Sequence, residues 1–180
     1  MEKVLIPGRL IVADSVALVF ILVVPALSHL TAVPFYLVDP MRLAALGVLL
    51  ATRDWKNSFV LAILLPVFSM LISGHPVFPK CLLISLELGV NVLLLEGLFR
   101  LMGQRWAVRP GIAAGAAAFF SIVLSKALYY LLKLAVISAG LLQMSLVSTS
   151  LWIQLIVSLG ISLVFAFVVS RTTYTPPRRE

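Results

Sequence analysis

Long runs of apolar residues, separated by short polar segments, dominate this chain. A helix needs about 20 apolar residues to cross the hydrocarbon of a bilayer, and roughly 17–25 are tolerated. Runs near that length predict membrane-spanning helices, whereas a shorter run predicts a helix that cannot span alone. The six expected helices cover approximately residues 9–27, 40–52, 57–73, 79–102, 110–133 and 150–170, of which 40–52 is the short one.

The segment before the short helix, residues 28–36, is apolar and carries no acidic or basic residue other than His29. Asp39-Pro40 is typical of a helix start, because an N-cap residue is followed by proline at the first helical position. Coil exposed to lipid would leave backbone groups without hydrogen bonds. We therefore expect this segment to fold into the protein. Pro66 predicts a kink in the third helix.

Composition agrees with one integral membrane domain. The 180 residues are 62% hydrophobic and 12% charged, and mean hydropathy is +1.13, whereas a soluble domain has roughly 25% charged residues. The first apolar stretch continues past Ala26 without a small-residue cleavage site, so we interpret it as a retained helix instead of a signal peptide.

The net charge of +7 would fit a nucleic-acid-binding protein, but the placement of the charges argues against that class. Cytoplasmic loops of membrane proteins collect Lys and Arg. Six helices put both termini and the second and fourth connections on one side. That side holds Lys3, Arg9, Arg53, Lys56, Arg100, Arg105, Arg109, Arg171, Arg178 and Arg179. We therefore predict cytoplasmic termini, a basic cytoplasmic tail at 171–180, and no nucleic-acid partner.

Polar side chains inside the helices gather toward the outer side. Such groups are costly in a bilayer and mark either function or an internal pair. Helical spacing places them on one face of each of three helices. These faces are Lys80, Glu87 and Asn91 on the fourth, Lys126, Tyr129, Tyr130 and Lys133 on the fifth, and Gln154, Ser158 and Ser162, with Trp152 nearby, on the sixth. Together they would suit an outward-facing pocket for a polar small molecule.

Internal packing is the alternative explanation for the same residues. Glu87 and Lys126 can pair with each other, and Tyr129, Tyr130 and Trp152 can belong to an aromatic belt at the membrane interface. Gln and Ser often only bridge helices. We favour a pocket for Glu87, Asn91 and Lys126, and leave the aromatic and serine residues open between the two explanations.

The remaining acidic residues have local explanations. We expect Glu96 to pair with Arg100 one helical turn later. Asp39 and Arg42 have the spacing of a pair across the first turn of the short helix, although they could instead face a ligand. Asp54 is placed to cap the third helix.

Small residues spaced four apart occur in two helices, as Ala13-x-x-x-Ala17 and Gly111-x-x-x-Gly115. This spacing lets helix backbones approach closely, and its default meaning is contact within the chain. Asp14 lies inside the first motif. Its role is open between a pair with Arg9 and contact with a partner chain.

Sequence signatures of catalysis are missing. The chain has no H-E-x-x-H, C-x-x-C, G-x-S-x-G or P-loop. The single cysteine, Cys81, excludes a disulfide framework and a Cys-based zinc cluster. Two isolated histidines, His29 and His75, are more typical of solvated or capping residues than of a metal pair. We therefore expect no enzymatic activity, no metal and no cofactor.

Residues 39–100 resemble the substrate-binding (S) components of energy-coupling factor (ECF) vitamin transporters. The features are a short helix after an apolar first loop and a third helix with Pro66 and Ser69, followed by a fourth helix that carries Glu87. The matching segments are Leu46-Gly47-Val48-Leu49-Leu50, Gly74-His75-Pro76-x-x-Pro79 and Leu98-Phe99-Arg100. Six helices, internal termini and the alanine pair of the first helix also agree.

The resemblance implies a six-helix bundle in a prokaryotic plasma membrane that captures a vitamin or similar micronutrient from outside. Its first, third and fifth loops cap the ligand. The implied partners are a transmembrane coupling subunit, which docks on the face holding Ala13 and Ala17, and two cytoplasmic ATPases. The expected substrate-binding residues are Glu87, Asn91, Lys126, Tyr130, Trp152, Gln154 and His75. Lys126 suggests an anionic group on the ligand, unless it only pairs with Glu87. A membrane scaffold subunit, such as an MreD-like cell-shape protein, is the alternative.

Overall fold

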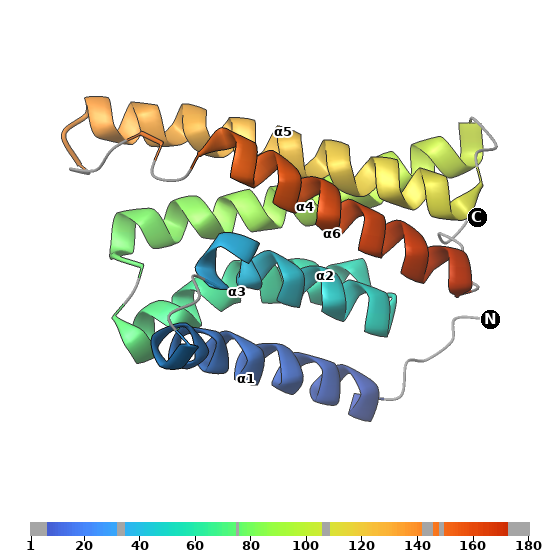
Figure 1. Ribbon diagram of the computed structural model, residues 1–180, viewed down its shortest axis with the longest axis horizontal. Coiled ribbons are helices and arrows are strands. Elements are labelled where there is room, and N and C mark those ends of the chain that lie inside the picture. The colour runs from blue at the N-terminus through green and yellow to red at the C-terminus, as the bar shows by residue number, and fades with distance from the viewer. Residues whose placement is uncertain are drawn as a thin grey trace. The chain divides into compact units, whose positions relative to one another are not determined.

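The structure of the protein, a computed structural model, describes residues 7–31, 35–74, 76–105, 109–141, 146–147 and 150–172. In these ranges the chain forms six α-helices, one 3-10 helix and no strand (Figure 1). The elements are α1 (Pro7–Thr31), η1 (Phe35–Val38), α2 (Pro40–Thr52), α3 (Trp55–Ser73), α4 (Phe78–Arg105), α5 (Pro110–Ser138) and α6 (Leu151–Arg171).

Five of these helices are long and apolar enough to cross a membrane, by length and composition. The exception is α2, whose 13 residues extend about 20 Å, less than the ~30 Å of a hydrocarbon core. The predicted all-helical membrane fold is therefore confirmed. The side of the membrane on which the termini lie stays a prediction.

An aspartate precedes both α2 and α3, but only the one before α3 caps its helix through its side chain. Asp54 Oδ1 accepts hydrogen bonds from the backbone N–H of Lys56 (2.9 Å) and Asn57 (3.2 Å), which confirms the predicted cap and starts α3 at Trp55, earlier than expected. Asp39 precedes α2 as predicted, but its side chain makes no capping bond. Its backbone has a left-handed φ of 56°, a conformation that Asp tolerates better than most residues.

The largest extensions beyond the predicted helix ends are those of α1 and α5. No helix-breaking residue follows Lys133 until Gly140, so α5 continues to Ser138. The chain then leaves the helix where Gly140 has a φ of 72°, as glycine commonly does after a helix. At the end of α1, residues 28–31 remain helical and the Thr31 hydroxyl donates to the Leu27 carbonyl at 2.7 Å. The first predicted loop is thus partly helix α1 and partly η1.

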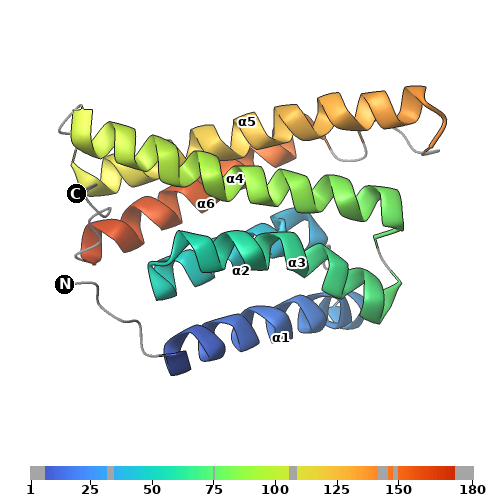
Figure 2. The ribbon, with the colours of Figure 1, turned by 180° about the vertical axis from the view of Figure 1, so that it is seen from behind.

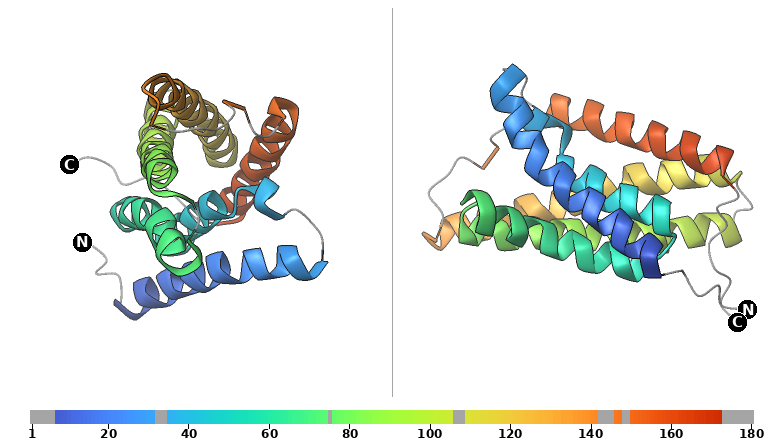
Figure 3. Two further views of the ribbon diagram at one scale, coloured as in Figure 1. Left: turned by 90° about the vertical axis from the view of Figure 1, so that its left-hand side faces the viewer. Right: turned by 90° about the horizontal axis from the view of Figure 1, so that it is seen from below.

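The helices group into two compact units, residues 1–89 and 90–180, with the boundary inside α4. In the first unit, α1 packs on α2, α3 and η1, and η1 also contacts α2 (Figure 3). This arrangement agrees with the expectation that the first outer segment folds into the protein. That both units form one transmembrane domain stays a prediction.

In the second unit, α5 and α6 lie along each other (Figure 2). A Cβ added at Gly111 would lie 2.8 Å from the Ser170 Cβ, and one added at Gly115 would lie 2.8 Å from the Ala166 Cβ. The glycine motif of α5 therefore makes a close contact within the chain, as predicted. Four further small residues of α5, Ala113, Ala114, Ala117 and Ala118, are fully buried.

Candidate functional site

Arg42 is the centre of a buried ionic cluster in the first unit. It lies in the first turn of α2 and is 1% exposed. Its Nη2 donates to Oε1 of Glu87 on α4, and its Nε lies 3.1 Å from Oδ2 of Asp39. The predicted pair of Asp39 with Arg42 is confirmed. An arginine buried without such partners would be strongly destabilising.

The guanidinium of Arg42 has more donors than partners. Arginine carries five N–H groups, yet Nη1 is buried and makes no hydrogen bond, and Nε faces Asp39 as an ion pair without hydrogen-bond geometry. The hydroxyl of Ser28, near the end of α1, is likewise buried without a hydrogen-bond partner. Because most buried polar groups in proteins are hydrogen-bonded, these atoms are exceptions among the described residues.

Glu87 is 7% exposed, and its carboxylate is directed at Arg42. A pair of Glu87 with Lys126, which the sequence left open, stays a prediction. Lys126 itself is half-buried on α5, in the second unit. The partner that sequence reasoning missed for Glu87 is Arg42, which is 45 residues away and has no spacing relation to it.

Asn91 lies one turn after Glu87 on α4 and is 1% exposed. Its side-chain N–H donates to the Ser121 hydroxyl of α5 at 3.1 Å, and that hydroxyl donates to the Ala118 carbonyl at 2.9 Å. The amide of Asn91 therefore has at least one partner inside the protein. Its predicted contact with a ligand stays a prediction.

Tyr130 and Gln154, both predicted ligand contacts, lie next to each other in the second unit. The Tyr130 hydroxyl is 2.9 Å from Gln154 Oε1 and 2.6 Å from Gln154 Nε2. Lys133, 2% exposed, donates to the Leu146 carbonyl at 2.9 Å and lies 5.9 Å from the centre of the Tyr129 ring. These residues form a polar cluster that joins α5 to α6.

The other members of the predicted set are exposed, bonded within their own helix, or outside the described residues. Trp152 is 75% exposed. The hydroxyls of Ser158 and Ser162 donate to the carbonyls of Gln154 and Ser158, within their own helix. His75 lies outside the described residues, so its predicted role stays a prediction.

An open groove of about 740 Å³ runs along α1 and α2 in the first unit. It is lined by Gly8, Arg9, Val12, Ala13, Val16, Ala17 and Phe20 of α1 and by Leu43, Ala44, Gly47, Val48 and Ala51 of α2. The lining is apolar except for Arg9. Both alanines of the predicted docking motif belong to it.

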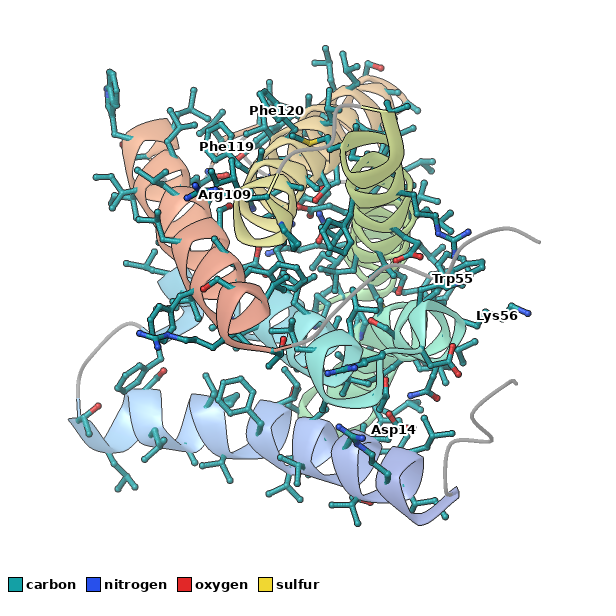
Figure 4. The ribbon with its side chains drawn as sticks, turned by 90° about the vertical axis from the view of Figure 1, so that its right-hand side faces the viewer. Asp14, Trp55, Lys56, Arg109, Phe119 and Phe120 are labelled. Carbon is teal, nitrogen blue, oxygen red and sulfur yellow. The ribbon has the colours of Figure 1, made fainter. Side chains whose placement is uncertain are left out.

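Asp14 does not line this groove, because its carboxylate is occupied elsewhere. Asp14 Oδ1 accepts a hydrogen bond from Asn57 Nδ2 of α3 at 2.8 Å. Figure 4 shows Asp14 on α1, with Trp55 and Lys56 marking the first turn of α3. The sequence left the contact of Asp14 open between Arg9 and a partner chain. In the structure, its carboxylate instead contacts the side-chain amide of Asn57, in the same unit.

Near the predicted cytoplasmic end of α4, Glu96 and Arg100 form the expected i, i+4 pair, with a distance of 2.6 Å from Nε to Oε1. Among the described residues, no group of three His, Cys, Asp or Glu side chains could hold a metal ion.

The chain matches no protein-family model, no curated protein and no solved structure. A functional proposal therefore depends on the residues themselves and on the contacts described above.

Proposed function

We propose that this chain is the substrate-binding subunit of an ECF-type importer, which captures a vitamin or similar small micronutrient at the outer side of a prokaryotic plasma membrane. The observation that carries the proposal is the buried Arg42–Glu87 pair. A buried ion pair contributes little to stability compared with apolar residues of the same size. Ionisable groups within membrane helices are therefore functional candidates by default.

On this proposal the chain performs no chemistry. It binds the micronutrient, and a coupling subunit with two cytoplasmic ATPases supplies the work of transport. The groove along α1 and α2 supports a docking role for Ala13 and Ala17, because small residues let another helix approach closely. The bond from Asn57 to Asp14 adds support, since it keeps the carboxylate out of the groove lining.

A membrane scaffold subunit is the second candidate, and a different observation favours it. The pairs Asn91–Ser121 and Tyr130–Gln154 satisfy polar groups inside the chain, as helix packing alone would require. A scaffold needs no ligand, so ligand binding separates the two candidates.

The deciding experiment is a thermal-shift screen of the purified chain in detergent against vitamins and their precursors. A ligand that binds only the folded state stabilises it by mass action, by about 2.7 kcal/mol at 100 times its Kd. We expect at least one compound to raise the melting temperature by several degrees. If no compound in the panel raises it, the scaffold function is favoured.

Glu87→Gln tests the site, and Glu96→Gln is its matched control. Both glutamates lie on α4, are 7% exposed and pair with an arginine. Because a hydrogen bond to a charged group contributes about 1.5–3 kcal/mol, we expect Glu87→Gln to weaken binding of the compound found in the screen by roughly tenfold or more. Glu96→Gln should leave its Kd unchanged. Equal Kd values for wild type and Glu87→Gln would exclude Glu87 from the site.

A further inference from the structure

The groove along α1 and α2 has the geometry of a helix-binding surface. Its lining residues recur in steps of four on both helices, from Gly8 to Phe20 on α1 and from Leu43 to Ala51 on α2. Rows with this spacing are the ridges between which the side chains of another helix pack. Along α1 the lining extends about 18 Å, or roughly three helical turns. The groove is therefore long enough for one further helix to lie in it.

Gly47, in the middle of α2, points to a close approach from outside the chain. Glycine destabilises a helix interior relative to alanine. Gly115 of α5 has a packing reason, because a Cβ there would lie 2.8 Å from the Ala166 Cβ. A Cβ at Gly47 would meet no described atom within 4 Å, although Gly47 lines the groove. The missing side chain therefore leaves room for a backbone that does not belong to the described chain.

Arg9 is the only polar residue of the lining and lies near the start of α1. Its side chain is exposed and makes no ion pair or hydrogen bond within the part of the chain that the structure describes. The only acidic residue of α1, Asp14, is bonded to Asn57 and lies outside the lining. A partner that covers this end of the groove takes the guanidinium out of water, which is strongly unfavourable unless an anion accompanies it.

Two kinds of molecule combine an apolar body with a negative charge at one end, namely an anionic phospholipid and an apolar helix that carries a carboxylate. Acyl chains are flexible and pack against an alanine as readily as against a glycine. A helix backbone approaches closely only where side chains are small. The open Gly47 and the four-residue rows on both helices therefore favour the helix.

We propose that this groove receives one apolar helix of the coupling subunit, and that an aspartate or glutamate of that helix pairs with Arg9. This inference rests on the proposed function and names the chemistry of its partner. The partner helix has small residues where its backbone passes Gly47, and its carboxylate lies near the predicted cytoplasmic end of α1. A charge pair at one end of an otherwise apolar contact fixes the register of the two surfaces.

A charge swap tests the pairing of Arg9. The full chain is titrated in detergent with the purified complex of the coupling subunit and its two ATPases, and the Kd of assembly is measured. We expect Arg9→Glu to weaken assembly by about tenfold or more, because it places like charges opposite each other. Lys56→Glu, at an exposed position outside the lining, is the control and should leave the Kd unchanged. One Asp→Lys or Glu→Lys change in the coupling subunit should restore binding to Arg9→Glu.

The other outcomes of the charge swap separate the inference from the proposed function. Equal Kd values for wild type and Arg9→Glu would overturn the inference and leave the proposed function standing, and so would a loss that no charge reversal in the coupling subunit restores. If the wild-type chain forms no complex, the inference fails together with the assignment to an importer. Native mass spectrometry tests for lipid. Phosphatidylglycerol that stays on wild type but not on Arg9→Glu, with assembly unaffected, would assign the groove to lipid and overturn the inference.

Gly47→Ala tests the close approach without changing any charge, and Gly160→Ala on α6 is its control. Neither added Cβ has a described atom within 4 Å, and alanine favours helix, so neither change should lower the melting temperature of the chain alone. We expect Gly47→Ala to weaken assembly by about tenfold or more, because the added methyl group holds the partner backbone away. Gly160→Ala should leave the Kd unchanged. An unchanged Kd for Gly47→Ala would show that no helix lies against Gly47, and the inference would fail.

Discussion

Asp54 stabilises the first turn of α3 through a single carboxylate oxygen. Two backbone N–H groups that have no partner within the helix donate to it. Because replacing an N-cap aspartate by alanine typically costs about 1 kcal/mol, we expect Asp54→Ala to lower the free energy of unfolding by that amount. Reversible unfolding in mixed micelles measures the change. Lys56→Ala, an exposed position in the same turn, is the control, and an equal loss in both variants would contradict the capping role.

Residue pairs could be predicted from the sequence only where helix geometry alone brings them together. The pairs Asp39–Arg42 and Glu96–Arg100 follow from spacings of three and four residues. Glu87 meets its partner across 45 residues, and no periodicity relates two such distant positions. The same reason explains why the contact of Asp14 with Asn57 was missed, since it requires knowing which faces of α1 and α3 meet.

At the scale of elements, the close contact between α5 and α6 gives a sharp prediction. A Cβ at Gly115 would lie 2.8 Å from the Ala166 Cβ and 3.3 Å from the Ser162 carbonyl oxygen. Gly115→Ala must therefore push the two helices apart, and overpacking typically costs about 1–3 kcal/mol. Unfolding in mixed micelles should show this loss. Gly160→Ala on α6 is the control, because its added Cβ would have no neighbour within 4 Å; a similar loss there would rule out crowding as the cause.

The existence of each helix could be predicted because the length of an apolar run decides it, but the ends depend on finer chemistry. Helix α5 continues past the predicted end at residue 133 to Ser138, shortly before Gly140 with its positive φ. Likewise, the Gly111–Gly115 motif predicts a close helix contact without indicating its partner. The shapes of both helix surfaces select that partner. On α6, Ser170 lies opposite Gly111 and Ala166 lies opposite Gly115.

At the scale of the whole molecule, the orientation in the membrane is a prediction from the distribution of Lys and Arg. Introduced cysteines can test it after replacing Cys81, which is buried, by serine. A membrane-impermeant maleimide should label Leu141→Cys, at an exposed site after α5, in intact cells. Lys56→Cys, in the first turn of α3, should react only after permeabilisation. The reverse pattern would place the termini outside.

Helix α1 exposes much of its apolar surface within the chain, including Val12 at 63% and Val16 at 62%. Lipid alone could cover such a surface. Lipid tails fill grooves as well as they cover ridges, however, so lipid does not explain why small residues line the groove on both α1 and α2. The proposed docking of a partner helix would explain it, because a helix backbone can approach closely where side chains are small.

If a coupling subunit docks in this groove, a bulky substitution in the groove lining should prevent assembly, whereas the same substitution elsewhere on α1 should not. Ala13→Trp would fill the groove, whereas Val19→Trp adds the same bulk on α1 at a position that is 57% exposed and outside the lining. We expect Ala13→Trp to abolish co-purification with a tagged coupling subunit and its ATPases, and Val19→Trp to retain it. Both variants should still bind the micronutrient, since the Arg42 cluster is unchanged. Loss of assembly in both variants would mean that α1 contacts its partner through a broad apolar face, and retention in both would remove the groove from the interface.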